Sequence, residues 1–151
     1  MKVVASLALA ASLSAVAFPA SAQFSKAETA VKYRQSVMFL MSQHFGRLAA
    51  MANGRVPYDA KAAAENAAIV ETLSKLPWAA FGPGTDMEGN TKALPAIWKD
   101  SAKFKEASEK MMGEVAKLNT AAKVGTLDAL KAQVGNAGGT CKGCHDNFQA
   151  K

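Results

Sequence analysis

Apolar residues recur along most of the chain at the three- and four-residue spacing of one helix face, and lysines and glutamates fill the positions between them. No segment shows the sustained alternation or the Val, Ile and Thr enrichment that predicts a strand. The pattern therefore predicts an all-α fold. Four helices are expected, from about Lys26 to about Asn53, from Asp59 to about Leu76, after Pro95 as far as Gly125, and from Thr126 onwards.

Local signals support these helix ends. Ser25 and Glu28 have the spacing of a capping box, in which both side chains satisfy amide groups at a helix start. Asp59 and Thr126 are good N-cap residues for the second and fourth helices. Gly54 is a residue type that commonly ends a helix, as is expected here for the first one.

Residues 82–91 are the longest stretch without helical periodicity, and they form a glycine-rich polar crossover between the second and third helices. Two short connections and this longer one give an antiparallel, up-down-up-down four-helix bundle, a fold that builds cofactor sites from side chains on facing helices. The apolar stripes predict a core made of Val31, Met38, Met41, Phe45, Leu48, Ala52, Ile69, Val70, Leu73, Leu76, Phe104, Ala107, Met111, Val115, Leu118, Ala122, Leu127, Leu130, Val134, Ala137, Cys141, Cys144 and Phe148.

The first residues have the pattern of a secretory signal peptide. Lys2 supplies a positive charge, an Ala/Leu/Val run follows, and the run ends in an Ala-x-Ala site at residues 20–22. A membrane-spanning anchor would need about 20 strongly apolar residues, whereas this run is short, rich in alanine and interrupted by serines. We expect cleavage after Ala22, export to the periplasm, and one mature domain, residues 23–151, that does not insert into a membrane.

Charge and composition exclude several classes of function. The chain has 18 basic and 12 acidic residues among 151, and loss of Lys2 lowers its net charge from +6 to +5. The lysines are spread over several segments with no aromatic residues between them, so the sequence does not favour nucleic-acid binding. No Ser/His/Asp set, paired carboxylates or phosphate loop indicates hydrolytic or transferase chemistry, and we expect that the chain is not an enzyme.

Near the end of the fourth helix, Cys141-Lys142-Gly143-Cys144-His145 is the Cys-x-x-Cys-His pattern of c-type haem attachment. The two thiols would form thioethers with the vinyl groups of one haem, and the imidazole would be the axial iron ligand. On a helix these positions share one face, so one porphyrin can meet all three side chains.

The Cys-x-x-Cys spacing has other interpretations, namely a thioredoxin-like pair, half of a zinc site or a structural disulfide. Zinc would need further thiols or histidines, and only His44 is left. A disulfide across three residues closes a loop too small to stabilise the fold much. Covalent haem is therefore the prediction. Gly138 and Gly139, just before the motif, are either tolerated weak helix formers or room for the macrocycle.

In such a bundle the beginning of the first helix lies beside the end of the fourth. At 1.5 Å per residue, Arg34 and Met38 stand about 12 and 18 Å into the first helix, and His145 stands about 9 Å from the chain end. The three residues are therefore expected at comparable heights. Phe45 and Leu48 lie deeper and are expected to be plain core.

The chain resembles cytochrome c′, the class II c-type cytochromes, over essentially the whole mature sequence. Four stretches carry the resemblance: Lys32-Tyr33-Arg34-Gln35 with Met38, His44-Phe45-Gly46-Arg47, Leu76-Pro77-Trp78 with Phe81-Gly82-Pro83-Gly84, and the haem motif followed by Asp146. The resemblance implies a homodimer of four-helix bundles with a five-coordinate, high-spin haem. It further implies that the vacant distal side of the haem faces Met38, and that Arg34, Gln35 and Thr91 contact the haem or its propionates.

One position departs from the family pattern. Many members carry Arg or Lys four residues after the axial histidine, and this chain has Gln149. Chemistry on the proximal face that relies on that cation therefore does not carry over.

The residue types leave several roles open. Met38 can ligate the iron and make a six-coordinate, low-spin electron carrier, or it can pack over an open site, which the resemblance favours. Arg34 can extend along its own stem to the surface or pair with a buried propionate. Gln35 either donates to the same group or is a solvated helix residue. Two functions follow, single-electron transfer in the periplasm and the binding of nitric oxide or carbon monoxide.

Overall fold

The computed structural model describes residues 23–87 and 89–151, and the expected signal peptide, residues 1–22, lies outside them. Four long helices make up most of the described chain: α1 (Ala27–Ala52), α2 (Ala60–Ser74), α4 (Ser101–Val124) and α5 (Leu127–Phe148). Two short elements lie between α2 and α4, the 3-10 helix η1 (Trp78–Ala80) and α3 (Ala96–Lys99). The all-α prediction is confirmed.

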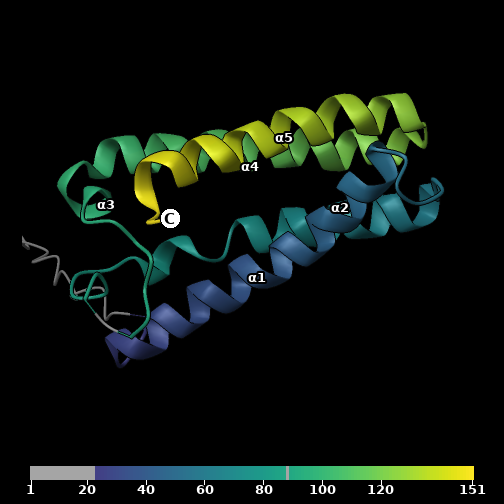
Figure 1. The fold of residues 1–151 in the computed structure, drawn as a ribbon. Coiled ribbons are helices and arrows are strands. Elements are labelled where there is room, and N and C mark those ends of the chain that lie inside the picture. The colour runs from purple at the N-terminus through teal and green to yellow at the C-terminus, as the bar shows by residue number, and fades with distance from the viewer. Residues whose placement is uncertain (1–22, 88) are drawn as a thin grey trace, which may run out of the picture.

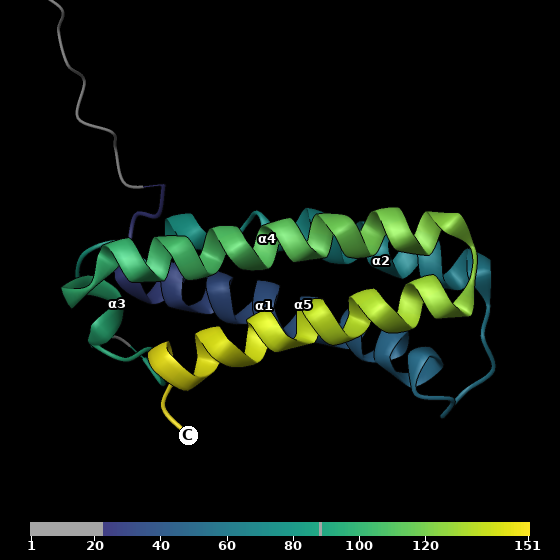
Figure 2. The same cartoon turned by 90° about the horizontal axis from the view of Figure 1, so that it is seen from above.

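The four long helices form an antiparallel bundle (Figures 1 and 2). Both α1 and α4 pack against α2 and α5, so consecutive long helices are neighbours and the first lies beside the last. This is the predicted up-down-up-down arrangement. It places the end of α5 beside the beginning of α1. In the part of the chain that the structure describes, no helix is both long and apolar enough to cross a membrane.

Three of the predicted helix signals are confirmed. Asp59 accepts a hydrogen bond from the amide of Ala62 at 3.0 Å. Thr126 accepts one from the amide of Ala129 at 3.4 Å. Gly125 ends α4 with φ of +79°, a left-handed conformation that glycine adopts at no steric cost.

The capping box predicted at Ser25 and Glu28 is wrong. The N-cap of α1 is Lys26, which makes no side-chain capping bond, and its carbonyl accepts from the amide of Thr29. Glu28 pairs instead with Lys32, 2.7 Å away and one turn further along the helix. The carboxylate is therefore used within α1 and does not reach back to the helix start.

The third predicted helix is divided in two. Asp100 follows α3 and is also the N-cap of α4, where its carboxylate accepts from the amide of Lys103 at 3.4 Å. A strong N-cap residue inside a periodic segment starts a new helix, and the apolar period alone does not report this.

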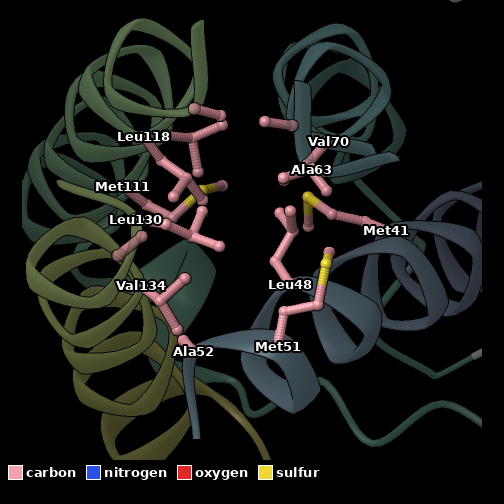
Figure 3. Packing of buried hydrophobic residues seen from close by; sticks show 14 residues of the cluster. Met41, Leu48, Met51, Ala52, Ala63, Val70, Met111, Leu118, Leu130 and Val134 are labelled. Carbon is pink, nitrogen blue, oxygen red and sulfur yellow. The ribbon is translucent and has the colours of Figure 1, made fainter. Parts of the chain in front are cut away.

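The bundle centre is an apolar cluster drawn from all four long helices (Figure 3). The α2 stripe is predicted wrongly at two positions, because Ile69 and Leu76 are exposed whereas Asn66 and Ser74 are buried. In an alanine-rich helix the larger side chains do not mark the buried face. The buried residues of the cluster are Met41, Leu48, Met51, Ala52, Ala63, Ala67, Val70, Met111, Val115, Leu118, Ala122, Leu130, Val134 and Ala137.

The C-terminus is joined to the segment before α3. Ala93 and Gln149 form an isolated antiparallel bridge. The amide of Leu94 donates to the carbonyl of Phe148 at 3.0 Å, and the amide of Ala150 donates to the carbonyl of Lys92 at 2.8 Å. The last turn of α5 is thereby held against the end of the crossover.

Candidate cofactor site

A cavity of about 630 Å³ lies between the middle of α1, the first part of α4, the crossover and the last turns of α5. Its volume falls in the range of cofactor and small-molecule sites, roughly 300–1,000 Å³. The fold brings all the predicted site residues to this one cavity. They are Arg34, Gln35, Met38, Thr91, Cys141, Cys144 and His145.

The haem motif lies on the last turns of α5. Cys141 and Cys144 are free, half-buried thiols, and His145 is exposed. Spacings of three and four residues place the three side chains on one helix face, and all three line the cavity. Lys142 and Asp146 form an exposed ion pair on the same turn.

Burial raises the pKa of both cysteine thiols. Desolvation is the main cause for Cys141 and for Cys144, and the neighbouring Cys141 raises the pKa of Cys144 further. A thioredoxin-like pair needs the opposite shift, because the thiolate is the reactive form. The apolar surroundings therefore disfavour a redox-active dithiol at this motif.

Apolar side chains from α1 face the motif across the cavity. Met38 is half-buried and lines the cavity together with the cysteines of α5. Phe45, which was predicted as plain core, lines the cavity as well. A Cβ at Gly138 would lie 3.5 Å from Cζ of Phe45, whereas one at Gly139 would meet nothing within 4 Å. Gly138 therefore gives room to a side chain of α1.

An aromatic wall that the sequence did not assign to the site closes another side of the cavity. It consists of Trp78, Phe81, Phe104 and Phe148, which come from η1, the C-cap of η1, α4 and α5. The ring centroids are 4.9 Å apart for Phe81 and Phe104, and 5.3 Å apart for Phe104 and Phe148. The sequence signal is weak, because aromatic bulk beside a turn and on two helix stripes resembles ordinary core.

Arg34 is buried, with 3% of its surface exposed, and does not extend to the surface. Its Nη1 donates to the carbonyl of Ala80 and to the hydroxyl of Thr85, both at 2.9 Å. Its Nη2 donates to the carbonyl of Thr85 at 2.7 Å and to the hydroxyl of Thr91 at 2.8 Å. Because these bonds use all four Nη hydrogens, a propionate pair with Arg34 would have to use Nε–H or replace one of them.

Gln35 and Thr91, two further predicted site residues, make hydrogen bonds at the end of the crossover. Nε2 of Gln35 donates to the carbonyl of Asn90 at 3.0 Å. The hydroxyl of Thr91 accepts from Arg34 and also from the amide of Ala93, at 3.1 Å. These contacts fix the crossover at the edge of the cavity.

His44 does not line the cavity. Its Nδ1 lies 2.8 Å from Oδ1 of Asn66, between α1 and α2, which agrees with its interpretation as an ordinary helix residue. Gln149, the position that departs from the family pattern, lines the cavity beside His145.

The residues of this cavity fit a haem attached through the motif. Its interior is apolar, as the porphyrin faces require, and two thiols and an imidazole share one helix face. Three exposed polar residues also line the cavity, where the propionates of a haem could stay solvated. They are Gln35, Asn90 and Lys92. The cavity therefore contains the two thiols and the imidazole that covalent attachment and iron ligation of haem c require.

Known proteins are similar to this chain in sequence and in fold. The family model described as Cytochrome C' matches residues 29–149. Cytochrome c' of Rubrivivax gelatinosus is 56% identical over 129 residues, 85% of this chain and 100% of the relative. Its crystal structure has a TM-score of 0.83 at 55% identity, over 85% and 100% of the two chains. A nitric oxide complex of a mutant of cytochrome c prime from Alcaligenes xylosoxidans has a TM-score of 0.79 at 48% identity, over 85% and 100%.

Proposed function

The chain belongs to the cytochrome c′ family, whose members bind haem c, and from this we propose that it is an exported haem protein with an open iron site for small gases. In this proposal Cys141 and Cys144 are the thioether attachments and His145 is the axial iron ligand. When bound, the haem supplies a redox-active iron that exchanges single electrons and takes diatomic ligands.

The observation that carries the proposal is that Met38 and the haem motif line the same apolar cavity. His145 is the only imidazole among the described residues that line it. A nitrogen ligand for the opposite side is therefore lacking in the described part of the cavity. Met38 is the side chain that we assign to the distal face, where it packs without ligating and leaves the iron five-coordinate and high-spin.

The solved relatives support gas binding. One is a nitric oxide complex and another is a carbon monoxide-bound variant, both of cytochrome c prime from Alcaligenes xylosoxidans. We propose that this chain takes the same class of ligand, a small diatomic gas, and that electron transfer with a redox partner is its second role.

The proposal does not include enzyme activity. A haem peroxidase would need an acid/base pair on the distal side. None of the described α1 residues that line the cavity is a histidine, an aspartate or a glutamate that could act as the base. The cavity therefore favours ligand binding and electron exchange over peroxide chemistry.

We further propose a periplasmic homodimer. Export is inferred from residues 1–22, and a homodimer is what the resemblance to the family implies. Exposed apolar side chains on α1 (Leu40), on α2 (Ile69) and just after α2 (Leu76) support a contact between subunits there. Ala63, a small residue of α2, is fully buried in the core and is not part of this surface.

The optical spectrum of the ferric holoprotein tests the open iron site. A five-coordinate iron gives a high-spin spectrum, and carbon monoxide binds to the reduced protein without loss of another ligand. A low-spin spectrum with a sulfur-to-iron charge-transfer band would instead assign Met38 as a sixth ligand and make the chain a dedicated electron carrier.

A further inference from the structure

Two sets of contacts connect Arg34 on α1 with the last turn of α5, which carries His145. The first consists of hydrogen bonds. Nη2 of Arg34 donates to the hydroxyl of Thr91 at 2.8 Å, and the same oxygen accepts from the amide of Ala93 at 3.1 Å. The guanidinium therefore fixes the local conformation of residues 91–93.

Residues 92–94 in turn pair with the C-terminus. Leu94 donates to the carbonyl of Phe148, and Ala150 donates to the carbonyl of Lys92. Between these two bonds, the amide of Gln149 caps α5 by donating to the carbonyl of His145 at 3.1 Å. The junction between residues 92–94 and 148–150 is thus connected by a hydrogen bond to the backbone of His145, the predicted axial ligand.

The second set consists of aromatic contacts. The guanidinium carbon of Arg34 lies 4.4 Å from the ring centroid of Phe81. Phe81 contacts Phe104, and Phe104 contacts Phe148, with centroids 4.9 and 5.3 Å apart. Phe148 is three residues after His145 and is buried. A displacement of the guanidinium would therefore reach the same helix end through packing as well.

The burial of Arg34 needs an explanation, since among the described residues no carboxylate lies within ion-pair distance and only the charge of Asp86 favours the guanidinium from further away. Burying a guanidinium is costly unless its donors are satisfied. An apolar residue could fill the space but could not hold Ala80, Thr85 and Thr91 at once. The planar guanidinium of Arg34 supplies several donors in one rigid group, and an apolar residue cannot replace them.

We propose that Arg34 is a positioning residue for His145. It fixes the crossover, the crossover fixes residues 92–94 against residues 148–150, and this junction sets the orientation and freedom of the helix end that carries the ligand. The inference rests on the assignment of His145 as the iron ligand under the proposed function. Arg34 is also one turn before Met38 on α1. In this proposal the same residue therefore helps to position both the distal side chain and the axial ligand.

The test compares three variants of the holoprotein. Arg34→Lys keeps the charge but loses the fork, and Thr91→Val removes only the hydroxyl that connects Arg34 with Ala93. The matched control is Asn119→Ala, which removes a partly buried hydrogen bond of 2.5 Å to Glu71 between α4 and α2. Two quantities are measured, amide hydrogen exchange at Leu94 and Ala150, and the iron–histidine stretching band of the ferrous protein.

We expect exchange at both amides to become about tenfold faster in Arg34→Lys and Thr91→Val, because each variant loses hydrogen bonds that fix residues 91–93. The iron–histidine band should shift or broaden in the same two variants. Asn119→Ala should leave the band and, after correction for global stability, the exchange as in the wild type.

The proposal is overturned if both variants keep the wild-type exchange and band, because Arg34 then holds only the crossover. It is also overturned if Asn119→Ala changes both quantities equally, since the effect is then a general loss of stability. A wild-type protein without any iron–histidine band would contradict the ligand assignment, and with it this role of Arg34, whatever the amides do.

Discussion

A Cβ atom at Gly138 on α5 would lie 3.5 Å from Cζ of Phe45 on α1, which is ordinary contact and leaves room for a methyl group but not for a larger side chain. Phe45 lines the haem cavity. The pair therefore sets how closely α1 and α5 approach beside the cofactor. At Gly139, the next residue, a Cβ would meet nothing within 4 Å.

The distance between Gly138 and Phe45 predicts opposite effects of a small and a large side chain at position 138. Gly138→Ala should keep Phe45 in place and raise the free energy of unfolding by up to about 1 kcal/mol, because alanine is the better helix former. Gly138→Leu should push Phe45 into the cavity, cost about 1–3 kcal/mol and lower the amount of attached haem. Denaturant unfolding and the haem absorbance per protein measure both effects.

Gly139→Leu is the matched control, because it adds the same side chain where there is no neighbour. It should retain full haem content. Equal haem loss in Gly138→Leu and Gly139→Leu would show that the helix, and not the contact with Phe45, limits haem attachment.

Haem should be needed for the fold as well as for the function, because Cys141 and Cys144 continue the core stripe of α5 at the cavity. We predict that Cys144→Ala blocks stable attachment of haem and lowers helicity, since the apolar cavity then lacks the group that fills it. Far-ultraviolet circular dichroism and thermal unfolding measure this. A haem-free variant with wild-type helix content and thermal stability would contradict it.

The raised pKa of the two thiols predicts slow alkylation before haem is attached. Burial disfavours the thiolates of Cys141 and Cys144, so each is more protonated at a given pH than an ordinary thiol. In the haem-free chain, under conditions where circular dichroism shows that the helices are retained, alkylation by iodoacetamide at pH 8 should be slower than for a cysteine peptide and should rise only above the usual thiol range. Faster alkylation than the peptide at pH 7 would indicate a thioredoxin-like pair.

Local sequence signals predicted much of the fold and the site. The caps at Asp59 and Thr126 need only their own helix, and the spacing of Cys141, Cys144 and His145 needs only one turn of α5. Loop lengths then put the beginning of α1 beside the end of α5, and the predicted site residues meet in one cavity.

What the sequence did not predict depends on partners far along the chain. The guanidinium of Arg34 binds residues 46 to 57 positions away, in η1 and in a crossover without any regular pattern. The bridge between Ala93 and Gln149 likewise joins two segments with no strand signal. The error at Ser25 and Glu28 has a local cause, because Lys32 competes for the carboxylate.

The exposed apolar side chains on α1 and on or just after α2 lead us to predict self-association. Leu40, Ile69 and Leu76 are each between 39% and 46% exposed, and a subunit contact would remove their apolar surface from water. Sedimentation at high micromolar concentration should give a dimer, and Ile69→Lys should shift it towards monomer. A purely monomeric wild-type protein would contradict the dimer and leave the haem assignment unaffected.

The most direct test of the open iron site facing Met38 is the rate at which carbon monoxide binds the ferrous protein, compared between wild type and Met38→Ala. If Met38 only packs over the site, the ligand must displace its side chain, at a cost of up to about 1.5 kcal/mol. The variant should then bind up to about tenfold faster, and its ligand-free spectrum should stay five-coordinate and high-spin like that of the wild type. A wild-type spectrum that is low-spin, and that Met38→Ala converts to high-spin, would contradict the account and show that the methionine ligates the iron.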